Sequence, residues 1–201
     1  MIEGIHVLEN IISIGKQDIL ENYFKGTTVK WKEVNNLWYF KDVKSPQSVI
    51  ISDEIKNKVI INLIEEIKNN ALVRLGLKEL QSYRAKVNKL TANKQYSQFN
   101  NKVSMHIDRD IKHVSMVYYI SNADGDTKFY NLLNGNIQNF VEYVKNKEFN
   151  RFQEIRAITP NKGSIVIFDG YTPHHSSYPT VTDRYVINYN VVPDLTSKTL
   201  I

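Results

Sequence analysis

The residues best suited to chemistry in this 201-residue chain are His106 and Asp108, two positions apart in the run Met105-His-Ile-Asp108. Residues two apart in a β-strand point to the same face of the sheet. An imidazole nitrogen and a carboxylate oxygen on one face supply two ligands for a metal ion. The simpler interpretation is a hydrogen bond between the two side chains, and this pair alone does not decide between the two.

A third metal ligand is available further along the chain, at His174 or His175. Both follow the apolar run Ser164 to Phe168, and a histidine just past a buried strand can face back into the mouth of a barrel. Two histidines and one carboxylate form the ligand set of non-haem Fe(II) oxygenases, which leaves metal positions open. Zinc, manganese and cobalt also accept such ligands, so the residue types do not select one metal.

Arg184 begins the predicted strand Arg184 to Val192, nine residues after His175. An arginine that faces the inside of a barrel is costly to bury unless an anion pairs with it. A guanidinium group binds a carboxylate through two parallel hydrogen bonds. Arg184 is therefore a candidate for binding an anionic co-substrate whose other end reaches the metal. The alternative is an outward-facing arginine in a surface ion pair.

The segments that position these residues differ in pattern along the chain. Residues 1–75 are predicted to be mainly helical, with a short helix from Gln17 to Lys25 that Gly26 ends. A second helix is predicted after Ser52, a candidate N-cap. Its apolar residues recur at helical spacing and form one stripe, which we expect to pack on a sheet. The stripe consists of Ile55, Val59, Ile60, Leu63, Ile64 and Ile67.

Residues 78–192 are predicted to form the core from short strands. Runs rich in β-branched and aromatic residues are typical of strands. These runs are Val114–Ile120, Thr127–Tyr130, Ile155–Thr159, Ser164–Phe168 and Arg184–Val192. Turn-forming residues separate them, and Ile137 to Lys145 is predicted to be an inserted helix. The pattern predicts a single domain over residues 1–201, of the α+β class and mostly β, whose N-terminal helices pack on a β-sandwich or barrel.

Composition limits the remaining possibilities. The chain has no cysteine, which excludes disulfides, zinc–thiolate sites and a cysteine nucleophile. No apolar run approaches the roughly 20 residues that span a bilayer, and the first residues lack the features of a signal peptide, so we expect a cytoplasmic protein without a membrane partner. The formal net charge is +5, but the lysines are scattered, which favours a solvated surface over a nucleic-acid site. The oligomeric state is not indicated.

In this order the residues resemble the 2-oxoglutarate/Fe(II)-dependent oxygenase superfamily, specifically its prolyl-4-hydroxylase-like branch. The resemblance covers residues 104–192 and implies a double-stranded β-helix, the jelly-roll barrel also found in cupins. The turn Gly125-Asp126 departs from the usual pair of glycines, and residues 131–151 are an insertion. The matching runs are His106–Asp108, Ser115–Asn122, Gly125–Phe129, Pro160–Phe168, His175–Pro179 and Arg184-Tyr185.

The resemblance implies roles for individual residues. His106, Asp108 and His175 match the iron ligands, which form the catalytic centre. Arg184 matches the residue that pairs with the far carboxylate of 2-oxoglutarate, and Tyr119 matches a tyrosine that hydrogen-bonds the same carboxylate.

The choice of His175 over His174 depends on spacing within the resemblance. Pro179 and Arg184 follow His175 at +4 and +9, as they follow the iron ligand in related prolyl hydroxylases. His113 is expected to be a packing residue.

The implied activity is hydroxylation of an unactivated C–H bond, with Fe(II), 2-oxoglutarate as co-substrate, O2, and ascorbate as an accessory reductant. The nearest substrate by resemblance is a prolyl residue in a peptide or protein. A free amino acid, another small metabolite or a nucleobase are the alternatives.

Three rival hypotheses stay open at this point. A non-catalytic barrel of the cupin or lectin type binds a metal or a sugar without redox chemistry. A different metalloenzyme on the same barrel includes His113 or His174 in its ligand set. In a purely structural protein the histidines are incidental.

Overall fold

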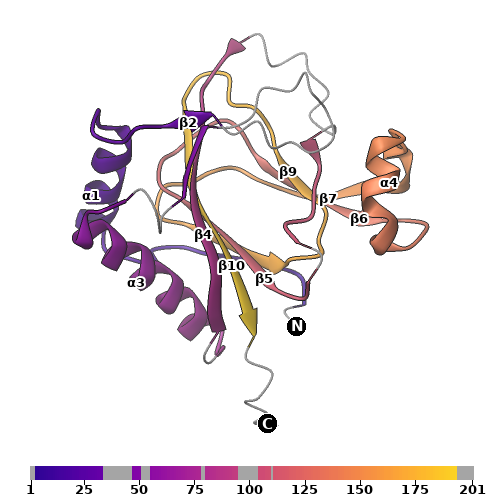
Figure 1. Cartoon of the computed structure of the whole chain (residues 1–201), viewed down its shortest axis with the longest axis horizontal. Coiled ribbons are helices and arrows are strands. Elements are labelled where there is room, and N and C mark those ends of the chain that lie inside the picture. The colour runs from indigo at the N-terminus through magenta and orange to yellow at the C-terminus, as the bar shows by residue number, and fades with distance from the viewer. Residues whose placement is uncertain are drawn as a thin grey trace.

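A computed structural model describes residues 3–33, 47–50, 55–77, 80–94, 104–109 and 111–193. Within these residues the chain forms a large and a small antiparallel sheet, with helices α1 and α3 on one side and α4 at the opposite end (Figure 1). No helix of the described chain is long and apolar enough to cross a membrane.

The large sheet has seven strands in the order β1-β8-β5-β10-β4-β3-β2, and every neighbouring pair is antiparallel. The strands are β1 (Ile5–Leu8), β8 (Ile165–Asp169), β5 (Val114–Tyr119), β10 (Arg184–Pro193), β4 (Leu80–Leu90), β3 (Gln47–Ile50) and β2 (Lys32–Glu33). The small sheet has the order β7-β6-β9, with β7 at Phe152–Ile158, β6 at Thr127–Leu132 and β9 at His174–Ser176. The predicted mostly β core is confirmed as two antiparallel sheets, neither of which closes into a barrel within the described residues.

Helix α1 (Ile14–Lys25) ends at Gly26, as predicted, although it begins before Gln17. Helix α3 (Lys58–Arg74) begins after Asn57, whose side chain accepts hydrogen bonds from the backbone N–H groups of residues 59 and 60. The predicted cap Ser52 lies outside the described residues. An asparagine in this position satisfies N–H groups that the first helical turn leaves without partners.

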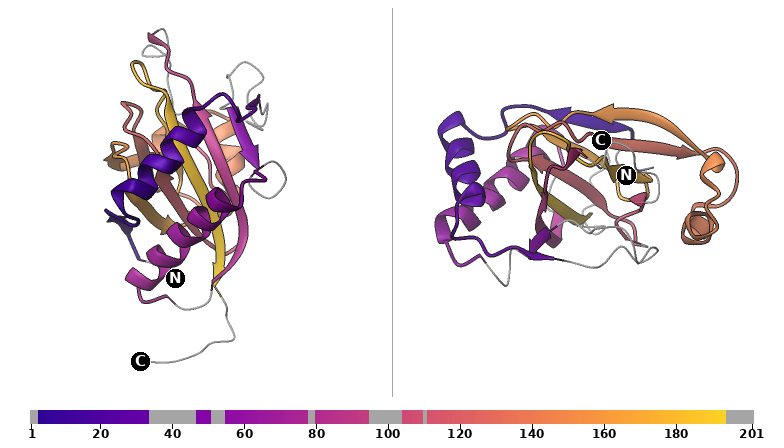
Figure 2. Two further views of the ribbon diagram at one scale, coloured as in Figure 1. Left: turned by 90° about the vertical axis from the view of Figure 1, so that its left-hand side faces the viewer. Right: turned by 90° about the horizontal axis from the view of Figure 1, so that it is seen from above.

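Both helices lie across one face of the large sheet (Figure 2). Their apolar residues, including Leu20, Phe24, Ile60 and Ile67, join sheet residues such as Ile187 in one buried cluster. Four residues of the predicted apolar stripe, Ile60, Leu63, Ile64 and Ile67, form the buried face of α3, because a stripe needs an apolar surface to cover it. Ile55 is buried but precedes the helix, and Val59 is exposed, so these two members of the stripe were predicted wrongly.

The other face of the large sheet packs against the small sheet. Strand β5 is buried at every position because both of its faces are covered. Met116 and Tyr118 belong to the cluster on the helix side, whereas Val117 and Tyr119 belong to a second cluster between the sheets. That second cluster consists of Val117, Tyr119, Phe129, Ile158, Val166, Phe168 and Val186.

The insertion between β6 and β7 builds a third cluster. It contains the short helices η3 (Ile137–Asn139), α4 (Phe140–Lys145) and η4 (Phe149–Arg151), so the helix predicted over Ile137 to Lys145 is confirmed. The buried members of this third cluster are Met105, Tyr130, Phe140, Val144 and Phe152.

Strand β1 was not predicted. It lies in the N-terminal part, which the sequence pattern describes as mainly helical, and it pairs with β8 at the edge of the large sheet. Its four residues are too few to show a strand period against the helical pattern that follows.

Candidate metal centre and anion site

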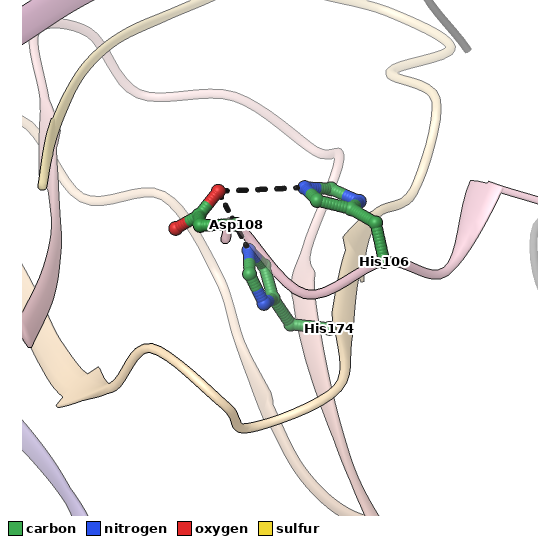
Figure 3. A group of neighbouring side chains, drawn as sticks. All are labelled: His106, Asp108 and His174. Carbon is green, nitrogen blue, oxygen red and sulfur yellow. Dashed lines mark ion pairs between the residues drawn. The ribbon is translucent and has the colours of Figure 1, made fainter. Parts of the chain in front are cut away.

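His106, Asp108 and His174 come together at the seam between the two sheets (Figure 3). Asp108 Oδ1 lies 3.8 Å from His106 Nε2 and 3.9 Å from His174 Nε2. One ligand atom from each residue lies within 4.8 Å of the others. This spacing leaves room for one ion that contacts all three atoms.

Backbone pairing brings the two histidines to the same face. His106 and His174 form an isolated antiparallel bridge, in which each backbone N–H donates to the other residue's carbonyl at 2.9 Å. Residues directly opposite each other in an antiparallel pair project their side chains to one side. The ring centroids are accordingly 4.5 Å apart.

Hydrogen bonds fix the tautomer of both rings. His106 Nδ1 lies 2.9 Å from the carbonyl oxygen of Ser104, and His174 Nδ1 lies 2.9 Å from that of Thr172. A carbonyl only accepts, so each Nδ1–H donates and each neutral ring keeps its lone pair on Nε2. This outer hydrogen bond is the one that orients histidine ligands in metal sites. Both Nε2 atoms are the atoms that face Asp108 Oδ1.

The other oxygen of Asp108 is held by the large sheet. Asp108 Oδ2 accepts hydrogen bonds from Ser115 Oγ at 2.5 Å and from Asn190 Nδ2 at 3.0 Å. Ser115 lies on β5 and Asn190 on β10, so two strands orient the carboxylate and leave Oδ1 toward the histidines. Neither Ser115 nor Asn190 was predicted to belong to the site. Asn190 could have been found from the sequence, because it lies an even number of residues after Arg184 and therefore on the same face of the strand.

The charge of the cluster suits a cation. Burial and the nearby His106 together lower the pKa of His174 to about 4, although Asp108 acts in the opposite direction. Burial raises the pKa of the Asp108 carboxyl, but His174, His106 and the hydrogen bond from Ser115 lower it overall. A carboxylate beside two imidazole nitrogens is a donor set for a divalent metal of the Fe(II), Mn(II), Co(II) or Zn(II) type.

The structure differs from the sequence-based choice between the neighbouring histidines. His174, not His175, lies in the cluster with His106 and Asp108. Successive residues of a strand point to opposite faces, so His175 is directed away from the cluster, where its Nε2 lies 2.9 Å from the Tyr130 hydroxyl. The spacing to Pro179 and Arg184 favours His175, whereas the structure brings its neighbour His174 to this position.

Arg184 and Tyr119 come together through Thr127. Arg184 Nη2 donates to Thr127 Oγ1 at 2.7 Å, and the Tyr119 hydroxyl lies 2.7 Å from the same oxygen. The guanidinium carbon lies 5.6 Å from the centroid of the Tyr119 ring. Burial lowers the pKa of Arg184 and raises that of Tyr119. Thr127, which the sequence analysis did not single out, therefore links the two predicted co-substrate residues.

Arg184 is buried, with 3% of its surface exposed, and the described residues provide no carboxylate in an ion pair with it. Its Nε atom is buried without a hydrogen-bond partner in the part of the chain that the structure describes. The side-chain oxygens of Asn88 and Asn188 are likewise buried without partners there, and both belong to the strand face that carries Arg184 and Asn190. A buried polar group without a partner destabilises the fold, so these atoms mark a surface that a polar ligand would complete.

His113 lies outside the metal cluster. Its Nδ1 lies 2.6 Å from the carbonyl oxygen of Ile111, and its ring packs on Gly170, where an added Cβ would lie 2.2 Å from the ring. This placement agrees with the packing role expected from the sequence.

No protein-family model and no curated protein matches this sequence. Solved structures do match in fold, and they include α-ketoglutarate-dependent enzymes and prolyl hydroxylases. The shared feature is the fold, since identities in this comparison are near one residue in ten.

Three of these structures illustrate the range. SnoK, a non-haem α-ketoglutarate-dependent carbocyclase from nogalamycin biosynthesis, has a TM-score of 0.63 at 10% identity, covering 94% of this chain and 79% of its own. A prolyl hydroxylase from Trichoplax adhaerens, solved with a hypoxia-inducible-factor peptide, has a TM-score of 0.59 at 12% identity, covering 94% and 84%. HygX from Streptomyces hygroscopicus, with nickel and 2-oxoglutarate bound, has a TM-score of 0.57 at 10% identity, covering 96% and 84%.

Proposed function

We propose that this chain is a 2-oxoglutarate- and Fe(II)-dependent dioxygenase that hydroxylates an unactivated C–H bond. In this proposal His106, Asp108 and His174 hold the iron, and Arg184 binds the far carboxylate of 2-oxoglutarate. The observation that carries it is the pairing of a converged two-histidine, one-carboxylate cluster with a buried arginine that forms no ion pair with the described residues. A similar fold in enzymes that use the same co-substrate supports it.

The distance between the two parts suits a short dicarboxylate. Thr127, which accepts from Arg184, pairs with Ser176 across β6 and β9, which makes His174 its diagonal neighbour. Diagonal neighbours on one face of an antiparallel pair lie about 7–8 Å apart. A five-carbon dicarboxylate can therefore meet the guanidinium at one end and an ion at His174 at the other.

Fe(II) with bound 2-oxoglutarate and O2 would supply the oxidising chemistry, which converts the co-substrate to succinate and CO2. The protein's residues hold and orient the reactants. Ser115 and Asn190 fix the Asp108 carboxylate, and the backbone carbonyls of residues 104 and 172 fix the two imidazoles. The hydroxyls of Thr127 and Tyr119 lie beside Arg184, where a carboxylate can accept from them.

The substrate is proposed by similarity only. A prolyl residue in a peptide is the first choice, because the neighbouring structures include prolyl hydroxylases, one of them with a peptide. A small molecule is the second choice, because HygX was solved with hygromycin B and SnoK is a carbocyclase. Prolyl peptides, free amino acids, other small metabolites and nucleobases therefore form the substrate panel.

The test is an anaerobic titration of the purified protein with Fe(II) and 2-oxoglutarate, followed by O2 and a succinate assay. We expect a weak visible charge-transfer band that needs both components, and then slow succinate formation without a substrate. The variant Asp108→Ala is expected to lose both signals while it stays folded. If folded, iron-loaded wild-type protein shows neither signal, the proposal fails and a non-catalytic metal- or sugar-binding barrel takes its place.

A further inference from the structure

The two segments that carry the cluster histidines rest on the same buried surface behind them. His106 and Asp108 point toward the metal cluster, whereas Met105 and Ile107 pack into the third cluster, which the α4 insertion builds. The same cluster contains Tyr130. The insertion therefore supports the motif of His106 and Asp108 from the face opposite to its ligand atoms.

Tyr130 holds the other segment in two ways. Its backbone N–H donates to the carbonyl of Pro173 at 2.9 Å, directly before His174. Its hydroxyl lies 2.9 Å from His175 Nε2, and the two rings stack with centroids 5.5 Å apart and an interplanar angle of 20°. Tyr130 thus hydrogen-bonds both neighbours of His174, Pro173 and His175.

The Tyr130 hydroxyl has two polar contacts. It lies 2.9 Å from His175 Nε2, where the imidazole tautomer decides which atom donates. It also lies 3.5 Å from Glu154 Oε2, which can only accept. Lys128 Nζ, 3.2 Å from the same oxygen of Glu154, completes a chain of contacts that reaches from the buried His175 to the surface.

We propose that Tyr130 and His175 are a positioning pair for the metal centre, anchored in the α4 insertion, which fixes β9 so that His174 faces the metal. This inference rests on the proposed function, because it assumes that His174 is a ligand. Strand β9 has only three residues, so backbone pairing alone offers little resistance to rotation or slippage. The hydrogen bonds between Tyr130 and the residues before and after His174 restrain the strand further.

If Tyr130 and His175 only stabilised the fold, their substitution would lower the melting temperature and leave metal binding unchanged. The test therefore uses the full chain with Co(II) as the probe metal, and it measures the Co(II) dissociation constant, the visible d–d spectrum and the melting temperature without metal. The variant Tyr130→Phe keeps the ring and removes the hydroxyl. The matched control is Tyr143→Phe in α4, whose hydroxyl accepts from the backbone N–H of Asn136 and takes no part in the contacts that join Tyr130 to Pro173 and His175.

We expect Tyr130→Phe to weaken Co(II) binding about tenfold, the low end for loss of an outer partner of a metal ligand, and to change the d–d spectrum. Tyr143→Phe should match the wild type in both. A second pair of variants controls for loss of folding. His175→Gln keeps a polar group that can hydrogen-bond the Tyr130 hydroxyl, so it should bind Co(II) more tightly than His175→Phe does.

The outcomes separate the two proposals. Wild-type affinity and spectrum in Tyr130→Phe and in His175→Phe would overturn the positioning role and leave the proposed function intact. A wild-type protein that binds no Co(II) would overturn the proposed function, and the positioning role with it. A change in melting temperature alone, with metal binding unaltered, would assign the pair to folding and so also overturn the inference.

Discussion

At the scale of single residues, His174 and His175 show how adjacent side chains of one type acquire different roles. The backbone bridge to His106 turns His174 toward Asp108, and strand alternation turns His175 toward Tyr130. Each imidazole has its own hydrogen-bond partner, so the two rings cannot exchange places without breaking both contacts.

The first prediction follows from this difference. His174→Ala should remove one of three ligands and leave no Fe(II) bound after anaerobic loading and gel filtration, whereas His175→Ala should retain iron at reduced affinity. Metal content per chain and circular dichroism of both variants provide the measurement. Equal iron content in the two variants, or loss only in His175→Ala, would contradict the placement of His174.

Arg184 carries the second prediction. Among the described residues its buried guanidinium has no carboxylate within ion-pair distance, and Asp126 acts on it only from further away, so an anion that reaches it gains an ion pair without breaking one. Wild-type protein with Mn(II) should be stabilised by 2-oxoglutarate, by about 2.7 kcal/mol at a concentration of 100 times the dissociation constant. Arg184→Gln should lose this stabilisation.

Thermal unfolding with and without 2-oxoglutarate measures the effect of Arg184→Gln. Arg156→Gln is the control, because Arg156 is an arginine that donates to the carbonyl of Ile5 at the surface. An undiminished shift in Arg184→Gln would show that the co-substrate binds elsewhere.

At the scale of secondary structure, most strands of the core were predictable, but β4, in which charged and polar residues interrupt the apolar ones, and the orientation of β9 were not. β5, β6, β8 and β10 are long enough for their β-branched and aromatic composition to show. In β9 both histidines are buried, with 4% and 1% of their surfaces exposed, so no polar–apolar alternation indicates which one faces inward. That information comes from the partner strand and the α4 insertion, which are distant in sequence.

Gly125 was recognised in the sequence as part of a turn, but the sequence does not show why a glycine is needed there. The residue is needed for a close approach, since an added Cβ would lie 2.6 Å from the carbonyl oxygen of Ser177 and 2.9 Å from the nitrogen of Pro179. Those two residues belong to the loop that joins β9 to β10. The turn therefore holds the loop between His174 and Arg184.

The third prediction concerns this contact. Gly125→Ala should destabilise the protein by about 1–3 kcal/mol, the usual cost of forcing a side chain into a packed position. Denaturant unfolding measures it, with Gly15→Ala as the control because an added Cβ there meets nothing within 4 Å. A free energy of unfolding equal to that of the control would show that the loop can move aside at little cost.

At the scale of the whole molecule, the candidate site joins the two sheets. Asp108 is held by β5 and β10 of the large sheet, while the bridge between His106 and His174 extends the small sheet. Helices α1 and α3 support the large sheet from outside, and the α4 insertion supports the segments of the small sheet. A metal at the seam would therefore link parts of the fold that have separate buried clusters.

The last prediction concerns how acid affects the fold through the loop after β9. Slight burial raises the pKa of Asp124, but hydrogen bonds from the Thr180 hydroxyl and from the backbone N–H groups of residues 180–182 lower it well below its usual value. A carboxyl whose pKa is lower in the folded state stabilises the protein above its unfolded pKa of about 3.9, and the stabilisation is lost as pH falls below that value.

We expect the melting temperature of the wild type to fall between pH 5 and pH 2 more steeply than that of Asp124→Asn, which should be less stable near pH 7. The exposed position of Asp124 makes the difference small, because solvent screens the interaction. Asp18→Asn, which removes a surface carboxylate paired with Lys162, controls for the loss of one charge. Parallel curves of melting temperature against pH for the wild type and Asp124→Asn would contradict this prediction. They would mean that the hydrogen bonds form equally well with the neutral side chain, and that Gly125 packing, not charge, holds the loop between His174 and Arg184.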